Sequence, residues 1–140
     1  MRLLLDTHAL LWALAIPEKL PATARRAIQS ADNEVHASVA SAWEISIKVA
    51  LGRLDFEVAS LEGALAASGI QLLGIDLKHT ARIATLPHHH RDPFDRLLVA
   101  QAISESMTLV TRDAELAKYG VRLLWREAAA RKRGPRRAGA

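Results

Sequence analysis

RLLLDTHALLW, residues 2–12, combines the pattern of a buried strand with the start of a helix. Leu3 to Leu5 form a short apolar run, which is typical of parallel strands buried on both faces. Asp6 ends this run, and the apolar residues after it recur at helical spacing. An acid in this position lies at the carboxyl end of a strand, where open α/β sheets bind their ligands. Asp is also a preferred N-cap, so a purely structural role for Asp6 stays open.

The sequence after this stretch alternates between strand and helix patterns. Further strands are predicted at residues 35–37, 70–75, 107–111 and 121–125. Further helices are predicted at residues 22–31, 39–51, 60–68, 77–86, 93–106 and 114–118. Strands that alternate with helices indicate a central parallel sheet with helices on both faces. The predicted fold class is therefore α/β, with one domain over residues 1–125.

Composition narrows the class of protein. A chain of 140 residues has room for one domain with a sizeable core, and it contains no cysteine for disulfides or thiolate metal sites. Asp6 and His8 interrupt the apolar start, and no small-residue cleavage site follows it. No apolar run reaches membrane-spanning length. We therefore expect a cytoplasmic protein that does not contact membranes.

The positive charge of the chain is concentrated at its C-terminal end. The net charge is +4, but residues 1–125 carry 13 basic and 14 acidic residues, a net charge of −1. Residues 126–140 carry six basic residues and one acid. The basicity therefore belongs to this tail, which we expect to be disordered, and not to the surface of the fold.

Four acids are expected to meet at one edge of the predicted sheet: Asp6, Glu44, Asp95 and Asp113. A doubly wound sheet brings the carboxyl ends of its strands and the amino ends of the following helices to one edge. Carboxylates that converge there without a cation repel one another, which raises their pKa values. Mg²⁺ or Mn²⁺ relieves that repulsion and prefers oxygen ligands. Two such ions about 4 Å apart can activate water and stabilise a leaving oxygen in phosphodiester cleavage.

The acids also have ordinary structural interpretations. Asp113 fits an N-cap, and Asp95 fits a capping-box acid in the helix that Asp92 caps. Glu44 fits an exposed i,i+4 pair with Lys48, a contact worth only about 0.3–0.5 kcal/mol. It is the expected convergence of all four that favours a metal site over these separate roles.

Four motifs resemble the PIN-domain ribonucleases, and within these the VapC toxins of bacterial toxin–antitoxin pairs. They are Leu4-Leu5-Asp6-Thr7-His8, Ser41-Ala42-Trp43-Glu44-Ile45, the run from Pro87 through Arg91-Asp92-Pro93-Phe94-Asp95-Arg96-Leu97-Leu98 to Ala102, and Leu109-Val110-Thr111-Arg112-Asp113. The motifs occur in family order and span about residues 1–125, whereas the basic tail lies outside the family pattern.

This resemblance implies an α/β PIN-like fold and a Mg²⁺-dependent endoribonuclease, with Mn²⁺ as a second option. The metal ligands that it implies are Asp6, Glu44, Asp95 and Asp113. An RNA substrate, a cognate antitoxin and a homodimer are the implied partners. Independently of the resemblance, the apolar residues Leu11, Trp12 and Leu14 suggest a dimer surface. Asp92 is common in this subgroup, but we interpret it as the helix cap.

Other polar residues near the acids have weaker assignments. Thr7 and Thr111 either orient an acid or a metal-bound water, or bond to local backbone. Arg91, Arg96 and Arg112 either hold RNA phosphates or neutralise the acids.

The histidines and tryptophans favour ordinary structural roles. His88, His89 and His90 suggest a zinc tract, but three consecutive loop residues cannot all face one ion. His8 is expected on a helix surface. Trp12, Trp43 and Trp125 are expected in the core or an interface, with stacking on RNA bases as a weaker alternative.

Two other functions remain open. One is a catalytically silent RNA- or protein-binding module, with the tail supplying affinity. The other is an aspartyl-phosphate receiver with Asp76 as the phosphorylated residue. The receiver requires a lysine after a late strand, where this chain has Arg112. Magnesium-dependent RNA cleavage distinguishes these functions.

Overall fold

A five-stranded parallel sheet forms the centre of the protein, as a computed structural model shows for residues 1–126. The strand order is β3-β2-β1-β4-β5, and every adjacent pair is parallel. The strands are β1 (Arg2–Leu5), β2 (Glu34–Ser38), β3 (Ile70–Leu73), β4 (Thr108–Val110) and β5 (Leu123–Leu124). The α/β prediction is confirmed.

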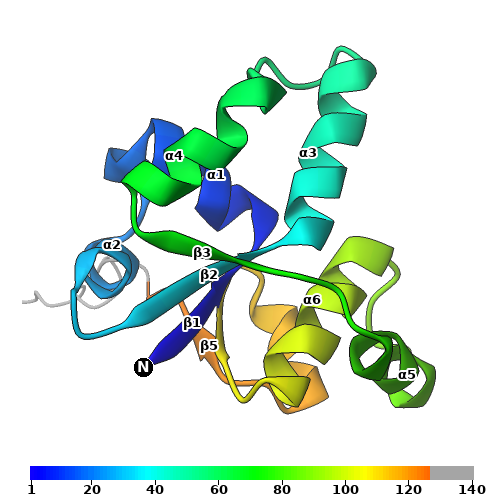
Figure 1. Ribbon diagram of the computed structural model, residues 1–140. Helices are drawn as coiled ribbons and strands as arrows, with labels where there is room; N and C mark the ends of the chain where they lie inside the picture. Colours follow the sequence, from blue (N-terminus) through cyan, green and yellow to red (C-terminus); the bar gives the residue numbers. More distant parts are fainter. Residues whose placement is uncertain (127–140) are drawn as a thin grey trace, which may run out of the picture.

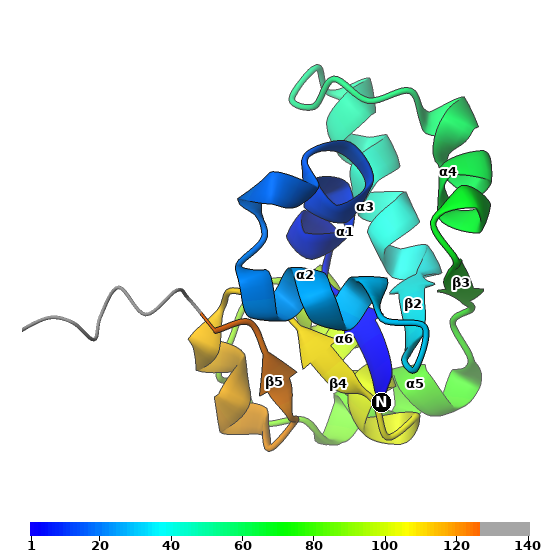
Figure 2. The same ribbon diagram turned by 90° about the vertical axis from the view of Figure 1, so that its left-hand side faces the viewer.

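Helices cover both faces of this sheet, as Figures 1 and 2 show. The α-helices are α1 (Thr7–Ala15), α2 (Ala22–Gln29), α3 (Val39–Ala50), α4 (Leu61–Ala67), α5 (Leu77–Thr85) and α6 (Pro93–Ser104). The 3₁₀ helices are η1 (Pro17–Lys19), η2 (Val58–Ser60) and η3 (Ala114–Tyr119). In Figure 1, α1, α2 and α4 lie on one face, whereas α5 and α6 lie on the other.

The apolar run of β1 contributes to both faces of the core. Leu3 and Leu5 pack with residues of α1, α2 and α4, whereas Leu4 packs with Leu109 and the inner side of α6. All three leucines of β1 are fully buried. Burial on both faces explains why this strand is continuously apolar and does not alternate. Within residues 1–126, no helix combines the length and the apolar character needed to cross a membrane.

Several predicted elements are shorter or of a different type than the sequence suggested. The strand expected at 70–75 ends at Leu73, whose partner Ser38 is the last residue of β2. The strand expected at 121–125 contains only Leu123 and Leu124, because this edge strand pairs with just two residues of β4. The helix expected at 114–118 is the 3₁₀ helix η3. The ends of the two strands are set by how many residues pair with the neighbouring strand, which is a tertiary property.

The topology places the carboxyl ends of β1 and β4 side by side. The chain runs from β1 outward to β2 and β3, and then returns to place β4 on the other side of β1. The Asp6 backbone N–H donates to the Val110 carbonyl at 3.0 Å, which fixes the two strand ends together. This reversal of strand order is the switch point at which α/β sheets bind their ligands. The predicted tail lies outside the described residues, apart from Arg126.

Candidate active site

All four acids predicted from the sequence line one cavity at this switch point. The cavity has a volume of about 420 Å³ and also contacts Asp92, Thr7, His8, Lys48 and Arg112. Asp6 follows β1, Asp113 follows β4, Glu44 comes from α3, and Asp95 comes from the first turn of α6. The structure therefore brings together residues that are up to 107 positions apart in the chain. Their role as metal ligands remains a prediction.

Asp6 and Asp113 are helix caps as well as cavity residues. Asp6 accepts a hydrogen bond from the Ala9 N–H at 2.8 Å, and Asp113 accepts one from the Glu115 N–H at 3.0 Å. Each cap uses only Oδ1 of its carboxylate, so capping does not occupy the second oxygen. The capping and site interpretations of these two acids are thus compatible.

Asp95 does not form the capping box that the sequence allowed. The Asp92 side chain caps α6 by accepting hydrogen bonds from the N–H groups of Phe94 and Asp95, at 2.8 and 3.2 Å. The Asp92 backbone N–H donates to His90 Nδ1, which occupies the place of the expected acid. The Asp95 carboxylate is therefore free to face the cavity, and Asp92 acts as the predicted cap.

Glu44 is held by polar neighbours on α1 and α3. The Thr7 hydroxyl donates to Glu44 Oε1 at 2.6 Å and lies 3.0 Å from the Ser41 hydroxyl. Lys48 pairs with Glu44 Oε2 at 3.0 Å, so the expected i,i+4 pair does form. However, only 13% of the Glu44 side chain is exposed, so Glu44 is more buried than a residue of a surface pair is expected to be. Of the two roles considered for Thr7, the structure shows the one in which it orients an acid.

Burial and mutual repulsion raise the pKa values of two of the acids. Burial raises the pKa of Asp6, and hydrogen bonds from Thr111 and Ala9 oppose that rise. Burial raises the pKa of Asp95 to about 7, with a further contribution from the Asp92 charge and an opposing one from His90. The ionised forms of these carboxylates are therefore costly unless a positive charge lies nearby, as it would in a site that binds a cation.

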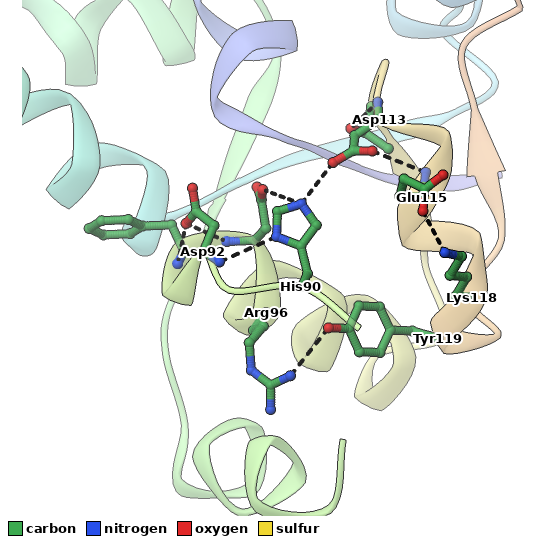
Figure 3. Close-up of polar contacts among 10 residues, drawn as sticks. His90, Asp92, Arg96, Asp113, Glu115, Lys118 and Tyr119 are labelled. Atoms are coloured by element: carbon green, nitrogen blue, oxygen red, sulfur yellow. Dashed lines mark hydrogen bonds and ion pairs between the residues drawn. The ribbon is translucent and has the colours of Figure 1, made fainter. Parts of the chain in front are cut away.

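His90 contacts the acids, a role that the sequence analysis did not assign. Its Nε2 lies 2.9 Å from Asp113 Oδ2 and 3.7 Å from Asp95 Oδ2 (Figure 3). His89 instead packs edge-on against the Tyr119 ring, and His88 is exposed. The three histidines therefore do not converge on a zinc ion. In the sequence, this contact of His90 with the acids is indicated only by its position two residues before the cap Asp92.

The arginines near the acids have different surroundings. Arg96 is buried and donates to the Pro87 carbonyl at 2.8 Å and to the Tyr119 hydroxyl at 3.2 Å, as Figure 3 shows in part. It ties the 87–92 loop to the core, so Arg96 takes neither of the two roles considered for it, phosphate binding or neutralisation of the acids. Arg112 lies at the cavity over the Trp12 ring, 5.4 Å from its centroid. The Thr111 hydroxyl accepts a hydrogen bond from the Asp113 backbone N–H and is also hydrogen-bonded to the Asp6 side chain.

The donor set of the cavity fits a hard divalent cation. Asp95 and Asp113, together with His90, offer ligand atoms that all lie within 4.8 Å of one another. Asp6 and Glu44 extend the carboxylate lining around the same cavity. Carboxylate oxygens are the ligands that Mg²⁺ and Mn²⁺ prefer. A cation bound among these oxygens would offset the burial that raises the pKa of Asp95.

Asp76, His79 and Glu105 form a second group that could ligate a metal, but their side chains are engaged in hydrogen bonds and ion pairs within the fold. The His79 ring accepts from the Asp76 backbone N–H at 2.9 Å and contacts Glu105 at 2.8 Å, and Lys78 pairs with the same carboxylate at 3.0 Å. Asp76 caps α5 after the edge strand β3. A receiver needs its phosphorylated Asp after a middle strand, so this position does not suit the receiver alternative.

Comparison with known proteins identifies the family. The model of the PIN domain family matches residues 3–122. Ribonuclease VapC22 of Mycobacterium tuberculosis is 31% identical over 118 residues, which cover 83% of this chain and 90% of that protein.

Solved structures share the fold at lower sequence identity. VapBC2 from Rickettsia felis, bound to a DNA fragment from its promoter, gives a TM-score of 0.68 at 19% identity and covers 90% of this chain and 100% of the other. VapBC-1 from nontypeable Haemophilus influenzae gives 0.63 at 18% identity, with coverage of 89% and 97%. By its match to the family model and its likeness to ribonuclease VapC22, the chain belongs to the PIN-domain family and to the VapC group within it.

Proposed function

We propose that the protein is a Mg²⁺-dependent endoribonuclease and the toxin of a toxin–antitoxin pair. The observation that carries this proposal is the convergence of Asp6, Glu44, Asp95 and Asp113 on one cavity at the switch point of a PIN fold. The name of the relative VapC22 supports ribonuclease activity. Mg²⁺, or Mn²⁺ in its place, would supply the positive charge that makes water a nucleophile near neutral pH and stabilises the leaving oxygen.

The side chains around the cavity have defined tasks in this proposal. Asp6 and Asp113 are held in place by their capping hydrogen bonds, and Thr7 holds Glu44. Fixed ligands cost little reorganisation when the metal and RNA bind. Arg112 lies beside the acids and is positioned to contact an RNA phosphate. Asp95, with its raised pKa, must give up its proton before it can ligate the metal.

Asp6→Asn tests the metal assignment, because it removes the charge while an amide oxygen still caps α1. We expect a loss of Mg²⁺-stimulated RNA cleavage of roughly two orders of magnitude or more, since metal-ion catalysis contributes several kcal/mol. Asp76→Asn is the matched control, because it changes a cap of the same type outside the cavity. Equal cleavage by the wild type and Asp6→Asn would show that the assignment is wrong. A wild-type protein that binds RNA without cleaving it would favour the silent binding module.

A cognate antitoxin is the proposed protein partner. The structural relatives include VapBC pairs and a toxin–antitoxin complex from Klebsiella pneumoniae, which supports such a partner. We expect it to place a basic side chain among the acids, in competition with Mg²⁺, because the cavity is rich in carboxylates. The product of a small open reading frame directly upstream is the protein to test. Unimpeded cleavage in its presence would contradict inhibition.

We also propose a homodimer, but through a different surface from the one that the sequence suggests. Leu11, Trp12 and Leu14 are partly buried against the core, so α1 is not the exposed apolar helix. Four of the exposed large apolar residues instead lie at four-residue spacing on α3 and its C-cap, and we call them the α3 stripe: Val39, Trp43, Ile47 and Leu51. Trp43 and Leu51 are more than half exposed. A row of exposed apolar side chains of this kind is typical of an interface, and we assign it to a second copy of the chain.

A further inference from the structure

The contact between His90 and Asp113 links two segments that are separate in the sequence. His90 lies in the loop before α6, and Asp113 lies 23 residues later at the start of η3. Figure 3 shows the imidazole edge pointing at Asp113, and Asp95 Oδ2 lies 3.7 Å from the same Nε2. Only 24% of the His90 side chain is exposed. The ring is therefore placed beside two of the acids that line the cavity.

The backbone determines which ring nitrogen of His90 carries the proton. Nδ1 lies 3.3 Å from the Asp92 backbone nitrogen and accepts its N–H, so Nδ1 has no hydrogen of its own. In the neutral ring the proton is then on Nε2, which donates to Asp113 Oδ2 at 2.9 Å. A ring nitrogen that carries a proton cannot also ligate a metal. The tautomer thus makes His90 a hydrogen-bond donor to a ligand and not a ligand itself.

The hydrogen bond from His90 completes the fixation of Asp113. Asp113 Oδ1 accepts from the Glu115 N–H at 3.0 Å, and Oδ2 accepts from His90. One donor on each oxygen sets the plane of the carboxylate and still leaves lone pairs for a cation. The Asp113 side chain is 37% exposed, so packing restrains it less than it restrains Glu44. Hydrogen bonds must supply the orientation that burial does not.

We propose that His90 is a positioning residue of the metal centre, which orients the Asp113 carboxylate for the cation through Nε2–H. The inference rests on the proposed function, because it assumes that Asp113 is a ligand. Partners that hydrogen-bond to ligands tune a metal site, and their loss typically weakens metal affinity about 10- to 100-fold. The same ring also holds the Asp92 backbone, so it links the cap of α6 to the acid after β4.

Mn²⁺ binding, measured by electron paramagnetic resonance without RNA, tests this role. His90→Ala is expected to bind Mn²⁺ about 10- to 100-fold more weakly than the wild type. His90→Gln keeps an N–H donor at a similar reach and is expected to recover most of that loss. His88→Ala is the matched control, because it removes an exposed histidine from the same loop. Each variant is also unfolded in urea without metal, which separates a loss of affinity from a loss of stability.

Each result supports or contradicts the proposal. Equal Mn²⁺ affinity of the wild type and His90→Ala would overturn it. So would a Gln variant as weak as the Ala variant despite equal stability in urea. Strong coupling of Mn²⁺ to a ¹⁴N nucleus that disappears in His90→Ala would show direct ligation and would also overturn it. Failure of the wild type itself to bind Mn²⁺ would refute the metal site, and with it both proposals. Weakened binding in His90→Ala with recovery in His90→Gln supports the positioning role.

Discussion

Asp95 is a residue at which burial and charge conflict strongly. Its pKa rises from 3.8 to about 7, mainly because it is buried and because Asp92 is nearby. In the unfolded chain the group ionises near its ordinary pKa, whereas in the metal-free fold it keeps its proton to near neutral pH. Between these values the folded state binds more protons than the unfolded state, so the free energy of unfolding falls as pH rises.

This conflict makes a prediction for Asp95→Asn. At pH 8 and with a chelator present, we expect the variant to be more stable than the wild type by roughly 1–2 kcal/mol, a value discounted for the partial exposure of the group. At pH 4 the two proteins should have nearly equal stability, because Asp95 is protonated in the folded wild type. Urea unfolding at both pH values measures the difference. A variant that is less stable than the wild type at pH 8 would contradict the raised pKa.

At the scale of the element, the amino end of α6 determines how the site residues are presented. Asp92 caps this helix through its side chain, while its backbone holds His90 and Pro93 fills the first turn. A proline at that position loses no helical hydrogen bond. The cap therefore orients the first turn so that Asp95 faces the cavity. The sequence showed the cap but not that His90 would take the place of the capping-box acid.

Two substitutions of Asp92 separate its capping role from a role in the site. Asp92→Asn should change stability little, because Asn caps a helix about as well as Asp. Asp92→Ala should lower the free energy of unfolding by about 0.5–2 kcal/mol. RNA cleavage by Asp92→Asn should fall far less than cleavage by Asp6→Asn. Circular dichroism and cleavage assays check this, and a folded but inactive Asp92→Asn would place Asp92 among the catalytic residues.

At the scale of the whole molecule, the α3 stripe predicts the oligomeric state. Trp43 packs edge-on against Phe94 at 5.1 Å, yet 57% of it stays exposed in the single chain. Trp43→Glu should convert a dimer into a monomer, because it would bury a charge at an apolar interface. Leu77→Glu is the control, since Leu77 is 86% exposed and lies on α5. Light scattering at micromolar concentration measures the mass, and a monomeric wild type would contradict the dimer.

The basic tail predicts a separate effect on RNA binding. Residues 1–125 carry a net charge of −1, whereas five basic residues lie between Arg131 and Arg137. Truncation after Arg126 should weaken RNA binding and make it less dependent on salt, because phosphate contacts release counterions. The cleavage positions should not change, since phosphate contacts carry no sequence information. Equal affinity and salt dependence of the two forms would show that the tail contributes nothing to binding.

Much of this protein follows from local sequence. The apolar run Leu3 to Leu5 indicated a strand buried on both faces, and the alternation with helices indicated the parallel sheet, because periodicity reflects which side chains must leave water. The caps Asp6, Asp92 and Asp113 were also recognisable, because capping is a contact between near neighbours. Chain topology then explains why the four acids line one cavity.

Only the tertiary structure decided the features that depend on distant segments. Arg96, expected to hold a phosphate or to neutralise the acids, is buried under a loop. A row of apolar residues is exposed on α3, whereas Leu11, Trp12 and Leu14 of α1 are partly buried. The contact of His90 with Asp113 and the raised pKa of Asp95 depend on how the 87–92 loop packs against η3 and the sheet edge. Periodicity and capping record which residues are buried or near a helix end. They do not record which loop side chain meets which acid, because that contact arises only when the chain closes around the switch point.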